Sequence, residues 1–458
     1  MRLFGTNGIR EVVGEKLTAP FIARVAAGIT TVLDPGDLVA VGWDARTSSP
    51  EIVRIVSATL ALAGHRVAEL GVLPTPAVQY LVPRLGAQMG IIATASHNPR
   101  EFNGLKCIAA DGLEVPRSVE EAIEVAAEAG NVRTVPYDSV GSIYPVADGA
   151  YRYVDGIVHQ VDAARIRKRH FTVVLDCGNG ASVTTGPDLL RSLGCRVITL
   201  NGHADGTFPG HLSEPTEANV QDLIHIVPAV GADLGIAHDG DADRAVFVDA
   251  SGRYVPGEET LALLARDAVE RAGGGIVVSP VSASQSLEDA VRPHGGSVVY
   301  TRVGSPAVTH EMQSQQAVFG GEENGGLIFP KFQYARDGGM SAAGMLDFLV
   351  RKDSSLAEAL KSVPRYALVR EKVPCPVESR GPVMAHVEAI LAEGADRVVT
   401  LDGIKAYRDG GWILLRPSGT EPLLRIFAES KDPARARALA DEGLTAVRRA
   451  LAAVPPTR

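Results

Sequence analysis

The chain has 458 residues, of which 45% are hydrophobic and 48 are glycine, a composition that suits three or four folded domains with ample cores. Its formal net charge of −9 argues against general nucleic-acid binding. An apolar signal core and a run of 18 apolar residues are both missing, and the four cysteines have neither metal-ligand nor disulfide spacing. We therefore expect a cytoplasmic protein that binds neither nucleic acid nor membranes, as a monomer or a homodimer.

Short apolar segments alternate with helical segments through the first part of the chain, and the same order of elements occurs three times. The first unit predicts strands at 38–44 and 66–70, a helix at 50–63, and a third strand that ends at Ser96. The second predicts strands at 172–176, 196–200 and 234–238 and a helix at 186–193. The third predicts strands at 275–280, 297–300 and 317–319 and a helix at 285–291. This alternation is typical of βαβ units with mainly parallel sheets.

The pattern changes after about residue 366. Strands are predicted at 412–415 and 424–428, and the Ala/Arg/Leu-rich segment 433–452 predicts a closing amphipathic helix. We therefore predict an α/β protein with three tandem related α/β domains, whose sheets are mixed, and a smaller C-terminal α+β domain around one central cleft. The predicted boundaries are 1–150, 151–250, 251–365 and 366–458.

A polar loop follows the last strand of the first unit and displays Ser96 within 94–99. Pro99 biases Asn98 away from the helical conformation, so the chain turns here. Ligands gather beyond the carboxyl ends of strands in such sheets, so the three loops at equivalent strand ends could face one cleft. Ser96 is a candidate nucleophile or phosphate carrier, although a plain turn serine fits the same pattern.

The loop that ends the second unit contains three alternating carboxylates, Asp239, Asp241 and Asp243. Close carboxylates repel one another unless a cation or proton lies between them, and their oxygens suit Mg²⁺. Arg244 and Ala250 stand where a calcium-binding EF-hand loop needs glycine and glutamate, which excludes that site. Two alternatives remain: Asp239 as the nucleophile of a haloacid-dehalogenase-like enzyme, and a solvated acidic turn.

The third loop and the C-terminal hairpin carry groups that suit a phosphorylated sugar. Glu322 and Asn324 lie among glycines, where a close backbone approach would let them bind sugar hydroxyls. The hairpin offers an anion cradle of hydroxyls, a glycine amide and two arginines: Arg416, Ser418, Gly419, Thr420 and Arg425. Taken singly, each pattern also fits an ordinary polar turn.

Lys106 lies ten residues after Ser96 and is a candidate proton acceptor, if nearby arginines depress its pKa. Most lysines are surface residues, and the sequence alone does not separate the two interpretations.

The order of these loops resembles the α-D-phosphohexomutase family over essentially the whole chain. The segments that carry the resemblance are 4–10, 44–46, 94–99, 103–106, 239–244, 321–325 and 416–422. It implies four domains around one large cleft. In chain order they would be a phosphoserine domain, a metal-binding domain, a sugar-recognition domain and a phosphate-binding domain.

The resemblance also implies roles for individual residues. Ser96 would carry the phosphoryl group as phosphoserine, and Lys106 would act as general acid and base. Asp239, Asp241 and Asp243 would hold Mg²⁺ together with a phosphoserine oxygen. Glu322 and Asn324 would bind sugar hydroxyls. The phosphoserine would be surrounded by Arg10, Arg46, His97 and Arg244, and the non-reacting phosphate would be bound by Arg416, Ser418, Gly419, Thr420 and Arg425.

The implied reaction interconverts a sugar 6-phosphate and a sugar 1-phosphate through a 1,6-bisphosphate, with an activator of the glucose 1,6-bisphosphate type. Many family members have Ser at position 324, His at 326 and Gly at 11, where this chain has Asn324, Gly326 and Glu11. A second proton-transfer group at position 326 is therefore missing. Gly326 resembles archaeal-type members, many of them assigned to phosphoglucosamine, which favours glucosamine 6-phosphate.

Three alternatives remain open. The first is a mutase for mannose, glucose or pentose phosphates. The second is a metal-dependent sugar-phosphate phosphatase, in which water intercepts phospho-Ser96. The third is a non-catalytic sugar-phosphate binding protein, which is disfavoured because Ser96, Lys106 and the aspartates are all present.

Overall fold

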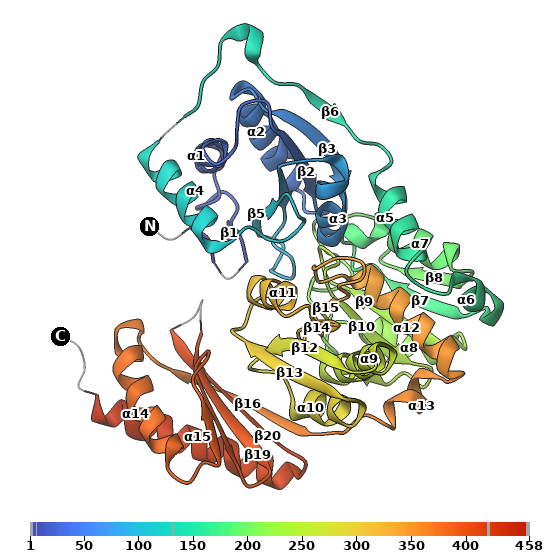
Figure 1. Cartoon of the computed structure of the whole chain (residues 1–458), viewed down its shortest axis with the longest axis vertical. Coiled ribbons are helices and arrows are strands. Elements are labelled where there is room, and N and C mark those ends of the chain that lie inside the picture. The colour runs from blue at the N-terminus through green and yellow to red at the C-terminus, as the bar shows by residue number, and fades with distance from the viewer. Residues whose placement is uncertain (1–2, 6, 131, 419–421, 455–458) are drawn as a thin grey trace.

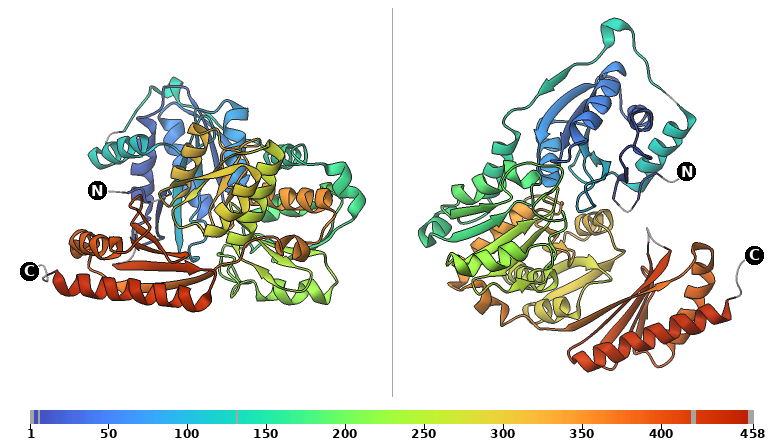
Figure 2. Two further views of the ribbon diagram at one scale, coloured as in Figure 1. Left: turned by 60° about the horizontal axis from the view of Figure 1, so that its bottom comes forward. Right: turned by 180° about the vertical axis from the view of Figure 1, so that it is seen from behind.

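The computed structural model of the chain describes residues 3–5, 7–130, 132–418 and 422–454. The described residues form four sheets, one in each of four domains, and the domains follow one another around an arc (Figure 1). The first and fourth domains form the ends of this arc, as the view from behind also shows (Figure 2, right). The predicted class, three tandem α/β domains with mixed sheets and a smaller α+β domain, is confirmed.

The first domain has a six-stranded sheet in the order β1–β5–β4–β2–β3–β6. Its strands are β1 (Ile9–Val12), β2 (Leu38–Trp43), β3 (Arg66–Val72), β4 (Met89–Ala93), β5 (Phe102–Ala109) and β6 (Ile143–Pro145). Its helices are α1 (Ala19–Thr30), α2 (Ser49–Leu62), α3 (Thr75–Leu85) and α4 (Arg117–Ala129). Ile91 of β4 packs with α2 and the next residue, Ile92, packs with α3, so helices cover both faces of the sheet.

The second domain has a five-stranded sheet in the order β11–β10–β9–β7–β8. Its strands are β7 (Thr172–Asp176), β8 (Arg196–Leu200), β9 (Leu234–His238), β10 (Ala245–Asp249) and β11 (Tyr254–Val255). Its helices are α5 (Gly149–Val158), α6 (Ala163–Arg169), α7 (Gly186–Ser192) and α8 (Gln221–Ala229). β9 is parallel to β7 and antiparallel to β10, so the loop 239–244 joins two neighbouring strands.

The third domain has a four-stranded sheet in the order β13–β12–β14–β15. Its strands are β12 (Gly275–Pro280), β13 (Gly296–Thr301), β14 (Phe319–Gly321) and β15 (Leu327–Ile328). Its helices are α9 (Gly257–Ala272), α10 (Gln285–Val291), α11 (Ser305–Ser314), α12 (Gly338–Lys352) and α13 (Leu356–Leu360). The loop 322–326 again joins two antiparallel neighbours, β14 and β15.

The fourth domain has an antiparallel sheet in the order β16–β20–β19–β18–β17, with its helices against it. Its strands are β16 (Ala367–Pro374), β17 (Arg397–Val399), β18 (Ile404–Arg408), β19 (Gly411–Pro417) and β20 (Leu423–Ser430). Its helices are α14 (Arg380–Ala392) and α15 (Pro433–Ala453). Short 3₁₀ helices in the chain lie at Tyr137–Ser139, Ala181–Thr184, Arg292–His294 and Val377–Ser379.

One apolar cluster runs through the first three domains, beside smaller clusters within each of them. Leu81 of α3, Ile157 of α5, Leu175 of β7 and Leu346 of α12 belong to the same buried cluster. The fourth domain has its own core, and a small separate cluster joins its Trp412 and Leu414 to Val281 of the third domain. We therefore expect the fourth domain to move more readily than the other three.

In the described part of the chain, α-helices that are both long enough and apolar enough to span a membrane do not occur.

Candidate active site

Ser96 lies just beyond the buried strand β4, in a strained backbone conformation. Its φ of 51° is in the left-handed region, which a non-glycine residue adopts at a cost, and its own N–H donates to Thr94 Oγ1 (2.9 Å). The side chain is fully buried, and its Oγ donates to Asp239 Oδ2 of the second domain (3.0 Å). The strained turn therefore places the hydroxyl of the first domain against a carboxylate of the second.

Arg46 holds the Ser96 loop in place through hydrogen bonds to its backbone. Its Nη1 and Nη2 donate to the backbone carbonyls of Pro99, Phe102, Ser96 and Asn98 at 2.6–2.9 Å, and its Nε donates to Asp44 (3.1 Å). These bonds occupy all five N–H donors of the guanidinium. Burial raises the pKa of the Asp44 carboxyl, which Arg46 opposes. Arg46 thus shapes the loop through its carbonyls, that of Ser96 included, and its place around the phosphoserine stays a prediction.

Replacing Arg46 with methionine should lower the free energy of unfolding by about 3–5 kcal/mol, because Asp44 and four carbonyls would lose a buried charged partner. Urea denaturation with and without the substitution measures this. Arg54→Met is the control, since Arg54 is exposed and pairs only with exposed Glu51 among the described contacts, and it should leave the midpoint unchanged. An equal midpoint for both variants would contradict the structural role of Arg46.

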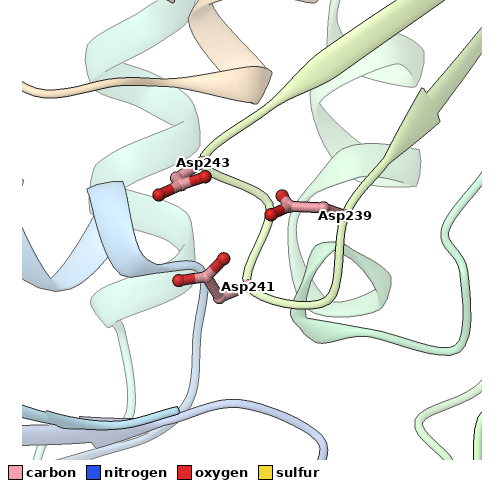
Figure 3. A group of neighbouring side chains, drawn as sticks. All are labelled: Asp239, Asp241 and Asp243. Carbon is pink, nitrogen blue, oxygen red and sulfur yellow. The ribbon is translucent and has the colours of Figure 1, made fainter. Parts of the chain in front are cut away.

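The three aspartates of the loop 239–244 converge, as Figure 3 shows, and each offers an oxygen within 4.8 Å of the others. All three are buried. Burial, together with the charges of Asp243 and Asp241, raises the pKa of Asp239 well above its usual range. Burial also raises the pKa of Asp241, but the ion pair and hydrogen bond with Lys106 outweigh it and hold that pKa below its usual range. The charged form of Asp239 is thus disfavoured, and a nearby cation would stabilise it.

The donor set of this cluster fits Mg²⁺. Asp241 Oδ1 and Asp243 Oδ1 are buried and have no hydrogen-bond donor within the described residues. Orphaned carboxylate oxygens of this kind are costly unless a cation takes them up, and Mg²⁺ prefers oxygen ligands. The hydroxyl of Ser96 lies beside the same cluster through Asp239. These residues are therefore the strongest candidates for a metal site.

Lys106 of β5 points into the carboxylate cluster. Its side chain is 2% exposed, and Nζ lies 2.8 Å from Asp241 Oδ2 and 3.7 Å from Asp243 Oδ2. The alternative of a surface lysine is therefore excluded. Thr75, which sequence reasoning missed, also donates to Asp241 Oδ2 (2.6 Å) from the start of α3. No pattern at the start of α3 distinguishes this threonine from an ordinary helix-start residue.

Three further predicted residues lie around the Ser96 loop. Arg10 Nη1 donates to Asn98 Oδ1 (2.9 Å), and Arg244 Nη2 lies 3.0 Å from His97 Nδ1. Burial and the charges of Arg244 and Arg10 lower the pKa of His97 to about 2, so its ring is neutral at physiological pH. His97 therefore accepts the hydrogen bond from Arg244, and the two arginines supply the positive charge on this side.

Glu322 and Asn324 lie on the loop between β14 and β15. Glu322 is buried, and its Oε2 accepts from Arg336 Nη1 (2.6 Å). Arg336 also donates to Asp243 Oδ2, so it bridges the third loop and the aspartate cluster. Asn324 Oδ1 accepts from the N–H of Gly326 (3.1 Å). Arg336 was not predicted, because an arginine before a helix N-cap carries no sequence signal of this role.

Two arginines predicted to bind phosphate, Arg416 on β19 and Arg425 on β20, occupy directly opposed positions in the sheet of the fourth domain. Two like charges at directly opposed positions destabilise a sheet unless an anion or a carboxylate lies nearby, and Arg416 pairs with Asp402 (3.2 Å). Ser418 is buried at the end of β19. Gly419 and Thr420 lie outside the described residues. The described ends of β19 and β20 next to this turn point toward the first domain (Figure 1).

The chain matches the four domain descriptions of one family, "Phosphoglucomutase/phosphomannomutase, alpha/beta/alpha domain" I, II and III and "C-terminal domain". The matches cover residues 1–133, 151–252, 256–366 and 372–446. A protein of Methanopyrus kandleri named probable phosphoglucosamine mutase is 41% identical over 98% of each chain. A phosphoglucomutase/phosphomannomutase of Thermococcus kodakarensis is 36% identical over 98% of this chain and 99% of its own.

A solved structure has the same architecture. The phosphoglucomutase/phosphomannomutase family protein of Burkholderia thailandensis superposes with a TM-score of 0.88 at 27% identity, over 100% of this chain and 98% of its own. The matches run through all four domains in the order seen here. The chain therefore belongs to the phosphoglucomutase/phosphomannomutase family of enzymes.

Proposed function

We propose that the protein interconverts a sugar 6-phosphate and a sugar 1-phosphate through phospho-Ser96 and a sugar 1,6-bisphosphate, with glucosamine 6-phosphate as the preferred substrate. The observation that carries the proposal is the strained, buried Ser96, whose hydroxyl lies 3.0 Å from one carboxylate of a three-aspartate cluster. The similarity to a probable phosphoglucosamine mutase at 41% identity supports the choice of sugar.

In the proposed reaction, the bond between phosphorus and Ser96 Oγ breaks while a bond forms between phosphorus and the 1-hydroxyl oxygen of the sugar 6-phosphate. Lys106 gives a proton from Nζ to the departing Ser96 Oγ and takes up the proton that the sugar hydroxyl releases. Arg10, neutral His97 and Arg244 stabilise the charge of the transferring group. Asp239, Asp241 and Asp243 would hold Mg²⁺, which supplies further neutralisation of the phosphoryl oxygens. In a second transfer, after the bisphosphate has turned around, the bond between phosphorus and the sugar 6-oxygen breaks while a bond forms between that phosphorus and Ser96 Oγ. Lys106 moves the proton in the opposite direction, and the sugar 1-phosphate is released.

Between the two transfers the bisphosphate must turn around without being lost. We propose that Glu322 and Asn324 bind its hydroxyls, and that Arg416, Ser418, Gly419, Thr420 and Arg425 bind whichever phosphate is not reacting. The separate core of the fourth domain supports a clamp that can move during this step. An activator of the glucose 1,6-bisphosphate type would restore phospho-Ser96 after loss of an intermediate.

We place the domain boundaries at 1–150, 151–250, 251–365 and 366–458, and the enzyme in the cytoplasm, acting on small sugar phosphates as a monomer or a homodimer. The four cysteines are buried free thiols, which supports a reducing compartment.

The proposed function is tested by phosphorus NMR of the purified protein with Mg²⁺ and a trace of glucose 1,6-bisphosphate. Separate samples contain the 6-phosphates of glucosamine, glucose and mannose, and ribose 5-phosphate. We expect conversion to a 1-phosphate, fastest with glucosamine 6-phosphate. Inorganic phosphate alone would indicate a phosphatase, and no change in any sample would contradict the proposal.

Replacing Arg425 with alanine should raise KM about 10- to 100-fold and leave kcat within a few-fold, because a charge-assisted hydrogen bond to the distant phosphate is lost in ground and transition states alike. Steady-state kinetics measure this split. Arg435→Ala is the control in the same domain, since Arg435 on α15 pairs with Glu442 of the same helix and with Asp409 in the turn between β18 and β19. An unchanged KM in Arg425→Ala would remove this residue from the phosphate clamp.

A further inference from the structure

Arg336 connects the loop between β14 and β15 to the aspartate cluster. Its Nη1 donates to Glu322 Oε2 in the third loop (2.6 Å), and its Nη2 donates to Asp243 Oδ2 in the aspartate cluster. The side chains of Arg336 and Glu322 are 6% and 7% exposed, so the ion pair between them is almost dry. A buried carboxylate that loses such a partner is strongly destabilised in its charged form. The position of the Glu322 carboxylate therefore depends on Arg336.

Gly326 makes room for this arginine. A Cβ atom at position 326 would lie 2.4 Å from Cδ and 3.2 Å from Cγ of Arg336. Gly326 is outside the left-handed region that favours glycine, so its backbone conformation does not require a glycine. A glycine is needed at position 326 because the side chain of Arg336 fills the space that a Cβ atom would take. The position at which the resemblance implies a histidine is thus occupied here by the side chain of Arg336.

We propose that Arg336 is a positioning residue that fixes the carboxylate of Glu322 for the sugar, and that Gly326 serves to admit it. The proposal rests on the proposed function and adds a determinant of sugar recognition to it. Arg336 occupies Oε2 of Glu322 and holds the carboxylate in place, so that Oε1 is oriented to accept from one sugar hydroxyl. Arg336 itself does not contact the reacting atoms; it acts through Glu322.

The proposal predicts coupling between Arg336 and one hydroxyl of the substrate. The test measures kcat/KM for glucosamine 6-phosphate and for its 3-deoxy and 4-deoxy analogues, in the wild type and in Arg336→Met. In the wild type, loss of the hydroxyl bound by Glu322 should cost about 100-fold, because a charged acceptor loses its donor. In Arg336→Met the same loss should cost less than about 10-fold, since Glu322 no longer holds that hydroxyl well.

Two further variants separate positioning from stability. We call the fold-loss in kcat/KM caused by removing the hydroxyl that Glu322 binds the deoxy cost. Gly326→Ala keeps the arginine but forces it aside, so it should reduce the deoxy cost as Arg336→Met does. Arg351→Met is the matched control: Arg351 also bridges two carboxylates, Asp267 and Asp347, but between α9 and α12. It should lower the thermal midpoint and leave the deoxy cost at its wild-type value.

Calorimetric binding of the same three ligands, in a Ser96→Ala background, gives a readout that does not depend on turnover. A wild type that binds the sugar phosphates but lacks mutase activity would contradict the proposed function and still test the role of Arg336. A deoxy cost that stays at the wild-type value in both Arg336→Met and Gly326→Ala would overturn the inference.

Discussion

Replacing Ser96 with alanine should lower mutase turnover at least about 10³-fold, the largest effect of any single substitution in the proposed site. Ser96 Oγ gives up a phosphoryl group in the first transfer and takes one up in the second. A chain without Oγ can therefore carry out neither transfer. Excess glucose 1,6-bisphosphate should not rescue the variant, because that compound acts by phosphorylating Ser96. Turnover of glucosamine 6-phosphate with and without the activator measures both points.

Ser213→Ala is the matched control for this experiment. Ser213 is a buried serine whose Oγ donates to the carbonyl of Asn98 (2.9 Å), so it touches the same loop without lying at the carboxylate cluster. Its removal should change turnover less than about 10-fold. Residual activity above a tenth of the wild type in Ser96→Ala would show that another group carries the phosphoryl group, and a similar loss in both variants would indicate damage to the loop instead.

The parts of this site that could be predicted from sequence are those whose chemistry is local. The aspartates at 239, 241 and 243 stand in one short loop after a strand, so their spacing alone predicts that they meet. The link from Arg336 to Asp243 spans 93 positions, and nothing near either residue indicates it. The role of Arg46 could not be predicted either, because its four carbonyl acceptors come together only in the folded chain. Tertiary partners decide such roles.

A similar limit applies to the fold. The strands 172–176, 196–200, 234–238 and 275–280 have the predicted bounds, because they are short apolar segments of one pattern. β5 was not predicted, although it carries Lys106, because its residues Asn103 and Gly104 are typical of a turn. Pairing with β1 and β4 makes it a strand, and a Cβ at Gly104 would meet Ile9 O at 1.8 Å. That glycine is required by packing between strands.

Replacing Asp241 with asparagine should raise the Mg²⁺ concentration for half-maximal activity at least about 10-fold and lower kcat about 10²- to 10³-fold. The substitution keeps the shape of the side chain but removes one of three charges that attract the ion. It also takes away the carboxylate that lies 2.8 Å from Lys106 Nζ, so the buried lysine keeps only Asp243, 3.7 Å away, among its described carboxylate partners. Metal removal with EDTA followed by Mg²⁺ titration measures the first effect, and steady-state kinetics at saturating Mg²⁺ measure the second.

The control for charge removal is Asp249→Asn, because Asp249 is buried on the same strand pair but accepts from the backbone N–H groups of Ser251 and Arg253. It should leave the Mg²⁺ titration unchanged. The two effects of Asp241→Asn have different physical origins, so they can be separated. A lower kcat with an unaltered Mg²⁺ titration would mean that Asp241 serves Lys106 alone and that the ion is held elsewhere. A shifted titration with full recovery of kcat at saturating Mg²⁺ would mean that the lysine does not need Asp241.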